Sequence, residues 1–141
     1  MSISNIFGIA ASAMNAQMVR MNSTASNMAN AGTVGSSAEE AYKAKRPVFQ
    51  ALLQEHQLDQ GAQFLGGVKI IGMVDDAQPN MKTHDPGNPV ADKDGFVFSS
   101  NVNEVTEMVE MMGAARSYQN NVEVVNTARE LMMRTLDITK A

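Results

Sequence analysis

The 141-residue sequence contains no cysteine and no tryptophan, and aromatic residues make up only 5% of it. The absence of cysteine excludes disulfide bonds, thiolate metal ligands and thiol catalysis, although it leaves the redox compartment open. Acidic residues outnumber basic residues by 15 to 11, for a net charge of −4. This balance argues against non-specific nucleic-acid binding, which needs a basic surface. No run of 18 apolar residues occurs, so the sequence predicts no membrane-spanning helix.

Proline and glycine are concentrated in the middle of the chain. All four prolines and eight of the ten glycines lie between residues 32 and 100. Because these residues mark turns and strands, the flanks are predicted to be helices and the middle to be strands and loops. The predicted fold class is α+β, with long N- and C-terminal helices packed as an antiparallel coiled-coil hairpin. The predicted domains are a helical domain, 1–31 with 101–141, and a small β-rich element, 32–100.

Both flanks carry apolar residues at coiled-coil spacing. In the first flank the series from Phe7 to Met28 alternates steps of four and three residues over three heptads, which is typical of a coiled-coil seam. The last flank averages one apolar residue per 3.5 from Met108 to Leu136. A plainer alternative is that the methionines only fill the core of a monomer. Asn101 with Glu104, or Asn103 itself, supplies N-cap chemistry for the last helix.

The middle of the chain predicts three or four short strands. Residues 44–53 form one candidate, although 51–53 also suit a helical turn, and residues 68–74 form a stronger one between glycine and aspartate pairs. Asp94 and Gly95 predict a hairpin turn before a strand at 96–98. The segment 85–89 predicts a rigid turn. Residues 34–41 follow no fixed pattern, and their conformation stays open.

The N-terminal helix is almost uncharged. Between residues 2 and 38 the single charged residue is Arg20, and the face opposite the methionine series consists of serine, asparagine, glutamine, alanine and threonine. A surface helix normally displays lysine and glutamate on its wet side. Small neutral side chains avoid the cost of burying a charge. We therefore interpret this helix as enclosed by protein on several faces in an assembly; the alternative is a helical hairpin in a monomer with polar residues outside.

Titratable residues provide no candidate catalytic centre. The two histidines are 28 residues apart in polar surroundings, the acidic pairs occur in turn contexts, and a short basic cluster is expected on the solvated face of a strand. Phosphate-loop, zinc-protease and serine-hydrolase motifs are absent. The sequence thus predicts no catalytic residue, no metal site, no cofactor and no small-molecule substrate. The residues considered are His56, His84, Asp75, Asp76, Asp92, Asp94, Lys43, Lys45 and Arg46.

Three segments carry a resemblance to a known family. The segment 24–33, TASNMANAGT, resembles the ASN-[LM]-AN motif near the N-terminus of bacterial flagellar rod and hook proteins. The segment 101–109, NVNEVTEMV, resembles the start of their C-terminal helix, and 116–128, RSYQNNVEVVNTA, continues it. The short length and the segment 85–95 resemble the proximal rod subunits more than the longer distal rod and hook proteins.

The resemblance implies a structural subunit of the flagellar basal body and not an enzyme. Such a subunit would polymerise into the proximal rod, transmit torque and continue the export channel. It would reach the periplasm through the flagellar type III export apparatus without a cleaved signal peptide, whereas sequence rules alone would make the chain cytoplasmic. The implied partners are further copies of itself, the rod subunits FlgB, FlgF and FlgG, the rod-ring adaptor FliE and the membrane ring.

The expected assembly residues lie in both flanks. Apolar members are expected to hold the helical hairpin, and neutral polar members to form hydrogen bonds between subunits. Two rival functions stay open: a rod-associated cell-wall-remodelling enzyme, which would need convergent carboxylates, and a cytoplasmic helical-hairpin adaptor. The expected residues are Phe7, Met14, Met18, Met21, Ser26, Asn27, Asn30, Met108, Met112, Tyr118, Asn121, Val122, Val125, Asn126 and Met132.

Overall fold

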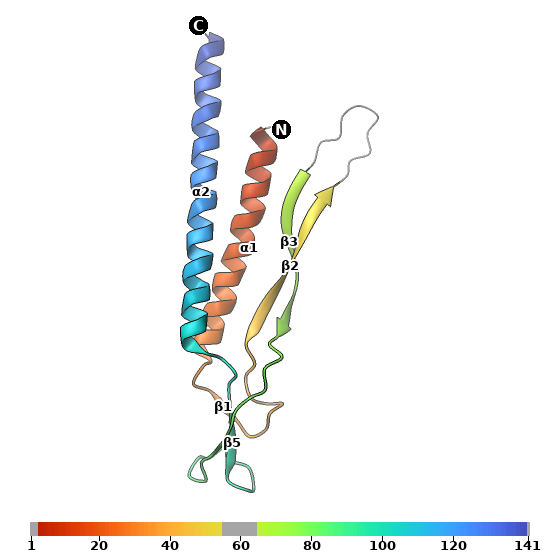
Figure 1. Ribbon diagram of the computed structural model, residues 1–141, viewed down its shortest axis with the longest axis vertical. Helices are drawn as coiled ribbons and strands as arrows, with labels where there is room; N and C mark the ends of the chain where they lie inside the picture. The colour runs from red at the N-terminus through yellow and green to blue at the C-terminus, as the bar shows by residue number, and fades with distance from the viewer. Residues whose placement is uncertain (1–2, 55–64, 141) are drawn as a thin grey trace. The chain divides into compact units, whose positions relative to one another are not determined.

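The computed structural model describes residues 3–54 and 65–140 and has an α+β fold (Figure 1). Two terminal helices pack together and the middle of the chain forms small antiparallel sheets, which confirms the predicted fold class. The finer coiled-coil packing stays a prediction. In chain order the elements are α1 (Ile3–Ala29), β1 (Val34–Gly35), β2 (Lys45–Gln54), β3 (Leu65–Asp75), β4 (Lys82–His84), β5 (Phe96–Ser99) and α2 (Glu104–Lys140).

The two helices begin and end close to the predicted limits. Helix α1 has 27 residues and α2 has 37, so they measure about 40 and 55 Å at 1.5 Å per residue. Asn103 is the N-cap of α2, because its Oδ1 accepts a hydrogen bond from the backbone nitrogen of Thr106 at 3.0 Å. Neither helix, over its described residues, combines the length and hydrophobicity needed to cross a bilayer.

The strands confirm most of the expectations for the middle of the chain. Strand β2 contains residues 45–53 of the candidate at 44–53, β3 contains the candidate at 68–74, and β5 contains 96–98. β2 and β3 form a two-stranded sheet. The described residues contain five strands rather than three or four, because the very short β1 and β4 carry too few residues to show a period of two.

The short strands form a second, three-stranded sheet in the order β1-β5-β4. Both pairings are antiparallel, with Val34 opposite Ser99 and Lys82 opposite Phe98. Gly95 has a φ of 76° at the turn before β5, a conformation that glycine adopts without steric cost. In the same turn the backbone nitrogens of Phe96 and Asp94 donate hydrogen bonds to Asp92, and these lower the pKa of its carboxyl group.

The described residues group into two compact units. The first unit takes its residues from Met1–Val19, Val48–Gly72 and Gly113–Ala141, and the second from Arg20–Pro47 and Met73–Met112. Each unit contains part of both helices and part of the middle segment. The predicted division into a helical domain and a β-rich element stays a prediction.

In the first unit, β3 lies against α1. The backbone nitrogen of Val68 donates to Oγ of Ser12 at 3.2 Å, and that hydroxyl donates to the carbonyl oxygen of Ile9 at 2.7 Å. Gly67 makes the approach possible, since a Cβ atom there would lie 3.2 Å from the same hydroxyl oxygen. A single serine thus satisfies a strand nitrogen that would otherwise be unpaired.

Gly35 provides a test of packing in the second unit. A Cβ atom at Gly35 would lie 2.7 Å from the backbone nitrogen and 2.9 Å from Cα of Ala41. Backbone cannot move aside as a flexible side chain can, so Gly35→Ala should lower the free energy of unfolding by about 1–3 kcal/mol. Urea unfolding measures this loss. The matched control is Gly32→Ala, where a Cβ atom meets nothing within 4 Å; equal stability of the two variants would contradict the packing described.

Candidate functional site

A buried asparagine in the second unit joins three segments of the chain. Asn27 of α1 lies in the motif segment 24–33 and is fully buried. Its Nδ2 donates to the carbonyl of Lys45 at 3.1 Å and to Oε2 of Glu107 at 3.0 Å. Its Oδ1 accepts from the backbone nitrogen of Lys45 at 2.8 Å and from the hydroxyl of Tyr42 at 3.0 Å. A primary amide has two donor hydrogens and two acceptor lone pairs, so all four are used.

The side chain of Asn27 forms the hydrogen bonds to Lys45, the first residue of β2, that a neighbouring strand would otherwise form. It contacts both the backbone nitrogen and the carbonyl oxygen of Lys45, which is how residues exchange hydrogen bonds in an antiparallel pair. Ser23, one turn earlier on α1, also donates to this carbonyl, at 2.6 Å. Because buried backbone groups must be paired, these two side chains allow β2 to begin directly against a helix.

The Asn27 amide also contacts a buried carboxylate. Glu107, in the first turn of α2, is fully buried, and its Oε1 lies 2.7 Å from a terminal nitrogen of Arg46. The Nε of Arg46 in turn donates to Asp76 at 3.3 Å. Desolvating a carboxylate costs several kcal/mol unless it is paired and hydrogen-bonded, and Arg46 and Asn27 meet both needs. We call Asn27, Tyr42, Lys45, Arg46 and Glu107 the Asn27 cluster.

Two further asparagines fix the chain just before β2. Oδ1 of Asn101 accepts from the backbone nitrogen of Ala44 at 2.7 Å, and its Nδ2 donates to the carbonyl of Gln78 at 2.7 Å. Nδ2 of Asn80 donates to the carbonyls of Tyr42 at 3.0 Å and Ser99 at 2.9 Å. Side-chain amides therefore replace strand neighbours along this segment. The Asn101 amide is thus bonded to Ala44 and Gln78, whereas Asn103, directly before Glu104, caps α2.

The predicted apolar assembly residues are incompletely covered in the isolated chain. Met18, Met108, Met112 and Val122 are exposed, whereas Phe7, Met14, Met21, Tyr118, Val125 and Met132 are half-buried. Among the α1 residues whose burial is described, 5–29, the buried ones are small or polar instead: Ala10, Ala16, Ser23, Thr24 and Asn27. The most buried face of α1 therefore lies outside the predicted methionine series. The part of that series in assembly stays a prediction.

Asn27 has a different role from the one expected. The sequence predicts a hydrogen bond from Asn27 to another subunit, but every polar group of its amide is used inside the chain. The physical reason is that β2 begins beside α1 and its first residue needs backbone partners. Ser26, one residue earlier on the exposed side of α1, has its hydroxyl 3.5 Å from that of Tyr42.

The remaining polar assembly candidates are bonded locally or exposed. Asn30 donates to the carbonyl of Ser26 and Asn121 to that of Ser117, each at 2.8 Å and each within one helical turn. Asn126 is exposed on α2. Their role in contacts between subunits stays a prediction.

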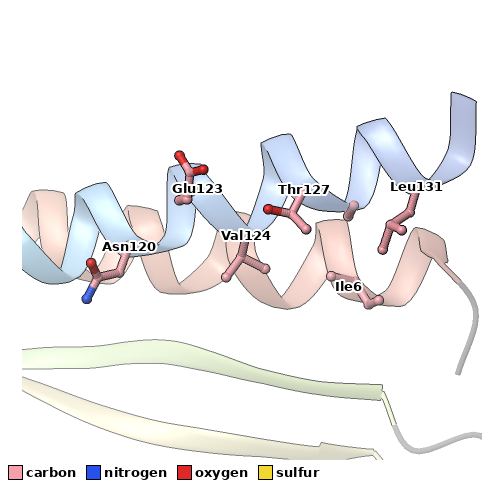
Figure 2. A pocket seen from close by; sticks show the side chains of 7 residues that line it. Ile6, Asn120, Glu123, Val124, Thr127 and Leu131 are labelled. Carbon is pink, nitrogen blue, oxygen red and sulfur yellow. The ribbon is translucent and has the colours of Figure 1, made fainter. Parts of the chain in front are cut away.

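The first unit contains an apolar groove between its two helical segments. The groove has a volume of about 450 Å³ and is lined by Ile6 of α1 and by Asn120, Glu123, Val124, Thr127, Ala128 and Leu131 of α2. Figure 2 shows Ile6 facing Val124 and Leu131 across it. Of these residues, none is in the predicted assembly set.

The histidines and acidic pairs do not form a reaction centre in the described residues. His84 packs edge-on against Phe96 with ring centroids 4.9 Å apart, and His56 lies outside the described residues. Over residues 3–54 and 65–140, no group of three or more histidine, aspartate or glutamate side chains is placed to hold a metal ion.

Two residues of the basic cluster, Lys45 and Arg46, form ion pairs with the acidic pair Asp75 and Asp76. Lys45 forms an ion pair with Asp75, and this hydrogen bond raises the pKa of the lysine above its ordinary value. Arg46 pairs with Asp76 and Glu107. The expectation that these basic residues form a solvated strand face is therefore wrong for Arg46, because its guanidinium turns toward a buried carboxylate.

Comparison with known proteins shows the family. Residues 93–138 match the family model described as the C-terminal region of flagellar basal body rod FlgEFG proteins. The chain is 46% identical to the flagellar basal-body rod protein FlgC of Yersinia enterocolitica and 43% identical to that of Salmonella typhimurium, in each case over 98% of both chains. The chain belongs to the FlgC family. It is therefore a structural rod protein of the flagellar basal body and not an enzyme, which confirms the resemblance and removes the wall-remodelling alternative.

Within this FlgC-family chain, sequence reasoning missed Glu107 and Arg46. Glu107 occupies the first turn of α2, where acidic residues are ordinary because they favour the helix dipole. Arg46 stands among other basic residues in an expected strand. The sequence does show three asparagines, Asn22, Asn27 and Asn30, in or beside the segment 24–33. Asparagine side chains often form hydrogen bonds to backbone groups, but the sequence does not identify the partner.

A new negative charge within the Asn27 cluster should strongly lower the stability of the fold. Asn27→Asp places a second buried carboxylate beside Glu107 and removes the donor to Lys45, so the free energy of unfolding should fall by about 3 kcal/mol. Adding Glu107→Gln should recover part of this loss, since the glutamine amide can donate to the new carboxylate. Chemical denaturation of both variants measures the effect.

The matched control is Asn22→Asp, an exposed change on the same helix, which should alter stability by no more than about 0.5 kcal/mol. Equal effects of Asn22→Asp and Asn27→Asp would contradict the assigned role of the cluster.

Proposed function

We propose that this chain polymerises through its two terminal helices into the proximal part of the flagellar rod, which transmits torque and continues the export channel. The observation that carries the proposal is similarity, over 98% of the chain, to proteins named flagellar basal-body rod protein FlgC. Large apolar side chains are exposed in each unit, Met18 and Val122 in the first and Met108 and Met112 in the second. They support the proposal, because exposed apolar surface often marks an interaction site.

The proposal includes an antiparallel coiled-coil arrangement of the helices in an inner layer. Residues 1–31 and 101–141 would form the helical domain, and 32–100 the outer β-rich element. The direction of the helices in the second unit supports this, since Arg20 pairs with Glu110 and Asn27, further along α1, contacts the earlier Glu107. A head-to-tail contact between two different surfaces of each subunit generates a helical rod instead of a ring when its rotation does not close, and the proposal includes such a non-closing contact.

The proposed partners follow from this location. They are further copies of the chain, the rod subunits FlgB, FlgF and FlgG, the adaptor FliE, the membrane ring and the flagellar type III export apparatus. The proposed location is the periplasmic part of the basal body, reached without a cleaved signal peptide. The net charge of −4 supports the absence of nucleic acid among the partners.

The cytoplasmic helical-hairpin adaptor that the sequence left open does not fit a structural rod protein of the flagellar basal body. Such an adaptor would be a stable monomer, whose helices would keep their apolar side chains covered. The exposed methionines of α1 and α2 favour the rod subunit over this reading.

Deletion of the gene followed by complementation tests the proposal. Cells without the chain should lack hook and filament, and the unchanged chain should restore them. Met18→Asp should not restore motility, because an assembly contact would then bury an unpaired carboxylate. Motility in soft agar and electron microscopy of basal bodies measure the result.

The matched control is Val90→Asp, another exposed apolar residue changed to aspartate, in the loop of the middle segment. Deletion cells complemented with Val90→Asp should be as motile as cells complemented with the unchanged chain. Full motility with Met18→Asp, or hooks and filaments in the deletion strain, would contradict the proposed function.

A further inference from the structure

The turn before β5 contains an aspartate that is followed directly by a glycine. Asp94–Gly95 is the one place in the sequence where a glycine follows an aspartate or an asparagine. Glycine has no Cβ atom to shield its backbone nitrogen. That nitrogen can therefore attack the side-chain carboxyl carbon of the preceding aspartate, and the product is a cyclic succinimide. Asp94 is exposed to solvent, so water reaches this carboxyl group.

The fold requires a glycine at position 95. Gly95 has a φ of 76°, which side-chain-bearing residues rarely adopt. A Cβ atom there would also lie 3.1 Å from Cβ of Pro86 and 3.2 Å from Nε2 of His84. A side chain would therefore strain the backbone and press on both neighbours. The glycine of this reactive pair is thus fixed by the fold.

Hydrogen bonds hold the attacking nitrogen of Gly95 in the folded chain. It donates to the carbonyl oxygen of Asp92 at 3.0 Å, which closes a β-turn over residues 92–95. The side chain of Asp92 secures the same turn, because its Oδ1 accepts from the backbone nitrogens of Asp94 at 2.9 Å and of Phe96 at 2.8 Å. The nitrogen must give up its hydrogen to attack Asp94, so the turn has to open before the ring can form.

We propose that Asp94–Gly95 is a site of aspartate isomerisation and that Asp92 protects it in the folded chain. When the turn opens, the nitrogen of Gly95 bonds to Cγ of Asp94, and its proton leaves with a hydroxyl group of the carboxyl as water. Water then adds to either carbonyl of the ring. Cleavage of the bond to the main-chain carbonyl carbon leaves an isoaspartyl linkage, and cleavage of the bond to Cγ restores aspartate. The overall change is an isomerisation that needs no oxidant and no cofactor.

Isomerisation would disturb the pairing of β4 with β5. An isoaspartyl linkage routes the main chain through Cβ and Cγ of residue 94, which lengthens the backbone by one carbon atom. The carbonyl oxygen of Gly95, which accepts from the backbone nitrogen of Asp85 at 2.9 Å, would shift. Phe96, which lies opposite His84, would shift with it. The modified chain should therefore lose hydrogen bonds at this end of the three-stranded sheet.

Ageing of the purified full chain tests the proposal. The unchanged chain and its variants are kept at neutral pH, and a protein isoaspartyl methyltransferase with a labelled methyl donor measures isoaspartate, which peptide mapping locates. In native buffer, Asp92→Ala should gain isoaspartate at residue 94 about tenfold faster than the unchanged chain, because it loses two hydrogen bonds to a charged group. The unchanged chain unfolded in urea should gain it at least as fast, since its turn is fully open.

The matched control is Asp85→Ala, which removes a nearby exposed carboxylate and leaves both hydrogen bonds to the Asp92 side chain in place. It should age like the unchanged chain. Asp92→Asn keeps an oxygen acceptor and should restore most of the protection. This variant separates the loss of two hydrogen bonds from a general unfolding of Asp92→Ala.

Equal rates for the folded and the urea-unfolded unchanged chain would overturn the proposal, because the turn would then give no protection. An Asp92→Ala variant that ages no faster than Asp85→Ala would overturn it as well. So would an Asp92→Asn variant that ages as fast as Asp92→Ala, or isoaspartate found only at aspartates other than Asp94.

Discussion

The backbone of Lys45 needs a partner where no strand is available, and the side chain of Asn27 supplies it. Both polar groups of that residue are bonded to one amide, which also contacts the carboxylate of Glu107. This constraint also fixes the positions of the residues on either side of Lys45. Arg46 is brought to the other oxygen of Glu107, and Ala44 is brought to Asn101. One asparagine therefore ties α1, the start of β2 and the first turn of α2 together in the second unit.

This arrangement has a consequence for the surface. A buried cluster of polar and charged groups contributes little net stability compared with apolar packing, but it accepts few alternative geometries. With the interior of this segment occupied by an asparagine and a glutamate, the large apolar side chains of α2 are turned outward. Exposed apolar side chains are unfavourable for an isolated monomer in water. They suit a structural protein whose surfaces are covered by neighbouring subunits.

The sequence was sufficient for both helices and for β2, β3 and β5, but not for the two shortest strands or for the contacts between elements. Proline and glycine placement predicted both helices, and local patterns predicted β2, β3 and β5. The strands β1 and β4 were missed because, at two and three residues, they are too short to show the period of a strand. The role of Asn27 was missed because its partners lie 18 and 80 residues away, and helical spacing carries no information about them. The heptad pattern of α1 predicted a helix but not which face is buried.

Hydrogen exchange at the backbone nitrogen of Lys45 tests the central role of Asn27 most directly. This nitrogen donates to a side chain and not to a strand, so its protection measures how firmly the amide holds β2. The account predicts that it exchanges as slowly as the amides in the last turns of α1, and that Asn27→Ala makes it exchange much faster. Rapid exchange at Lys45 in the unchanged protein, or protection that survives Asn27→Ala, would contradict the account.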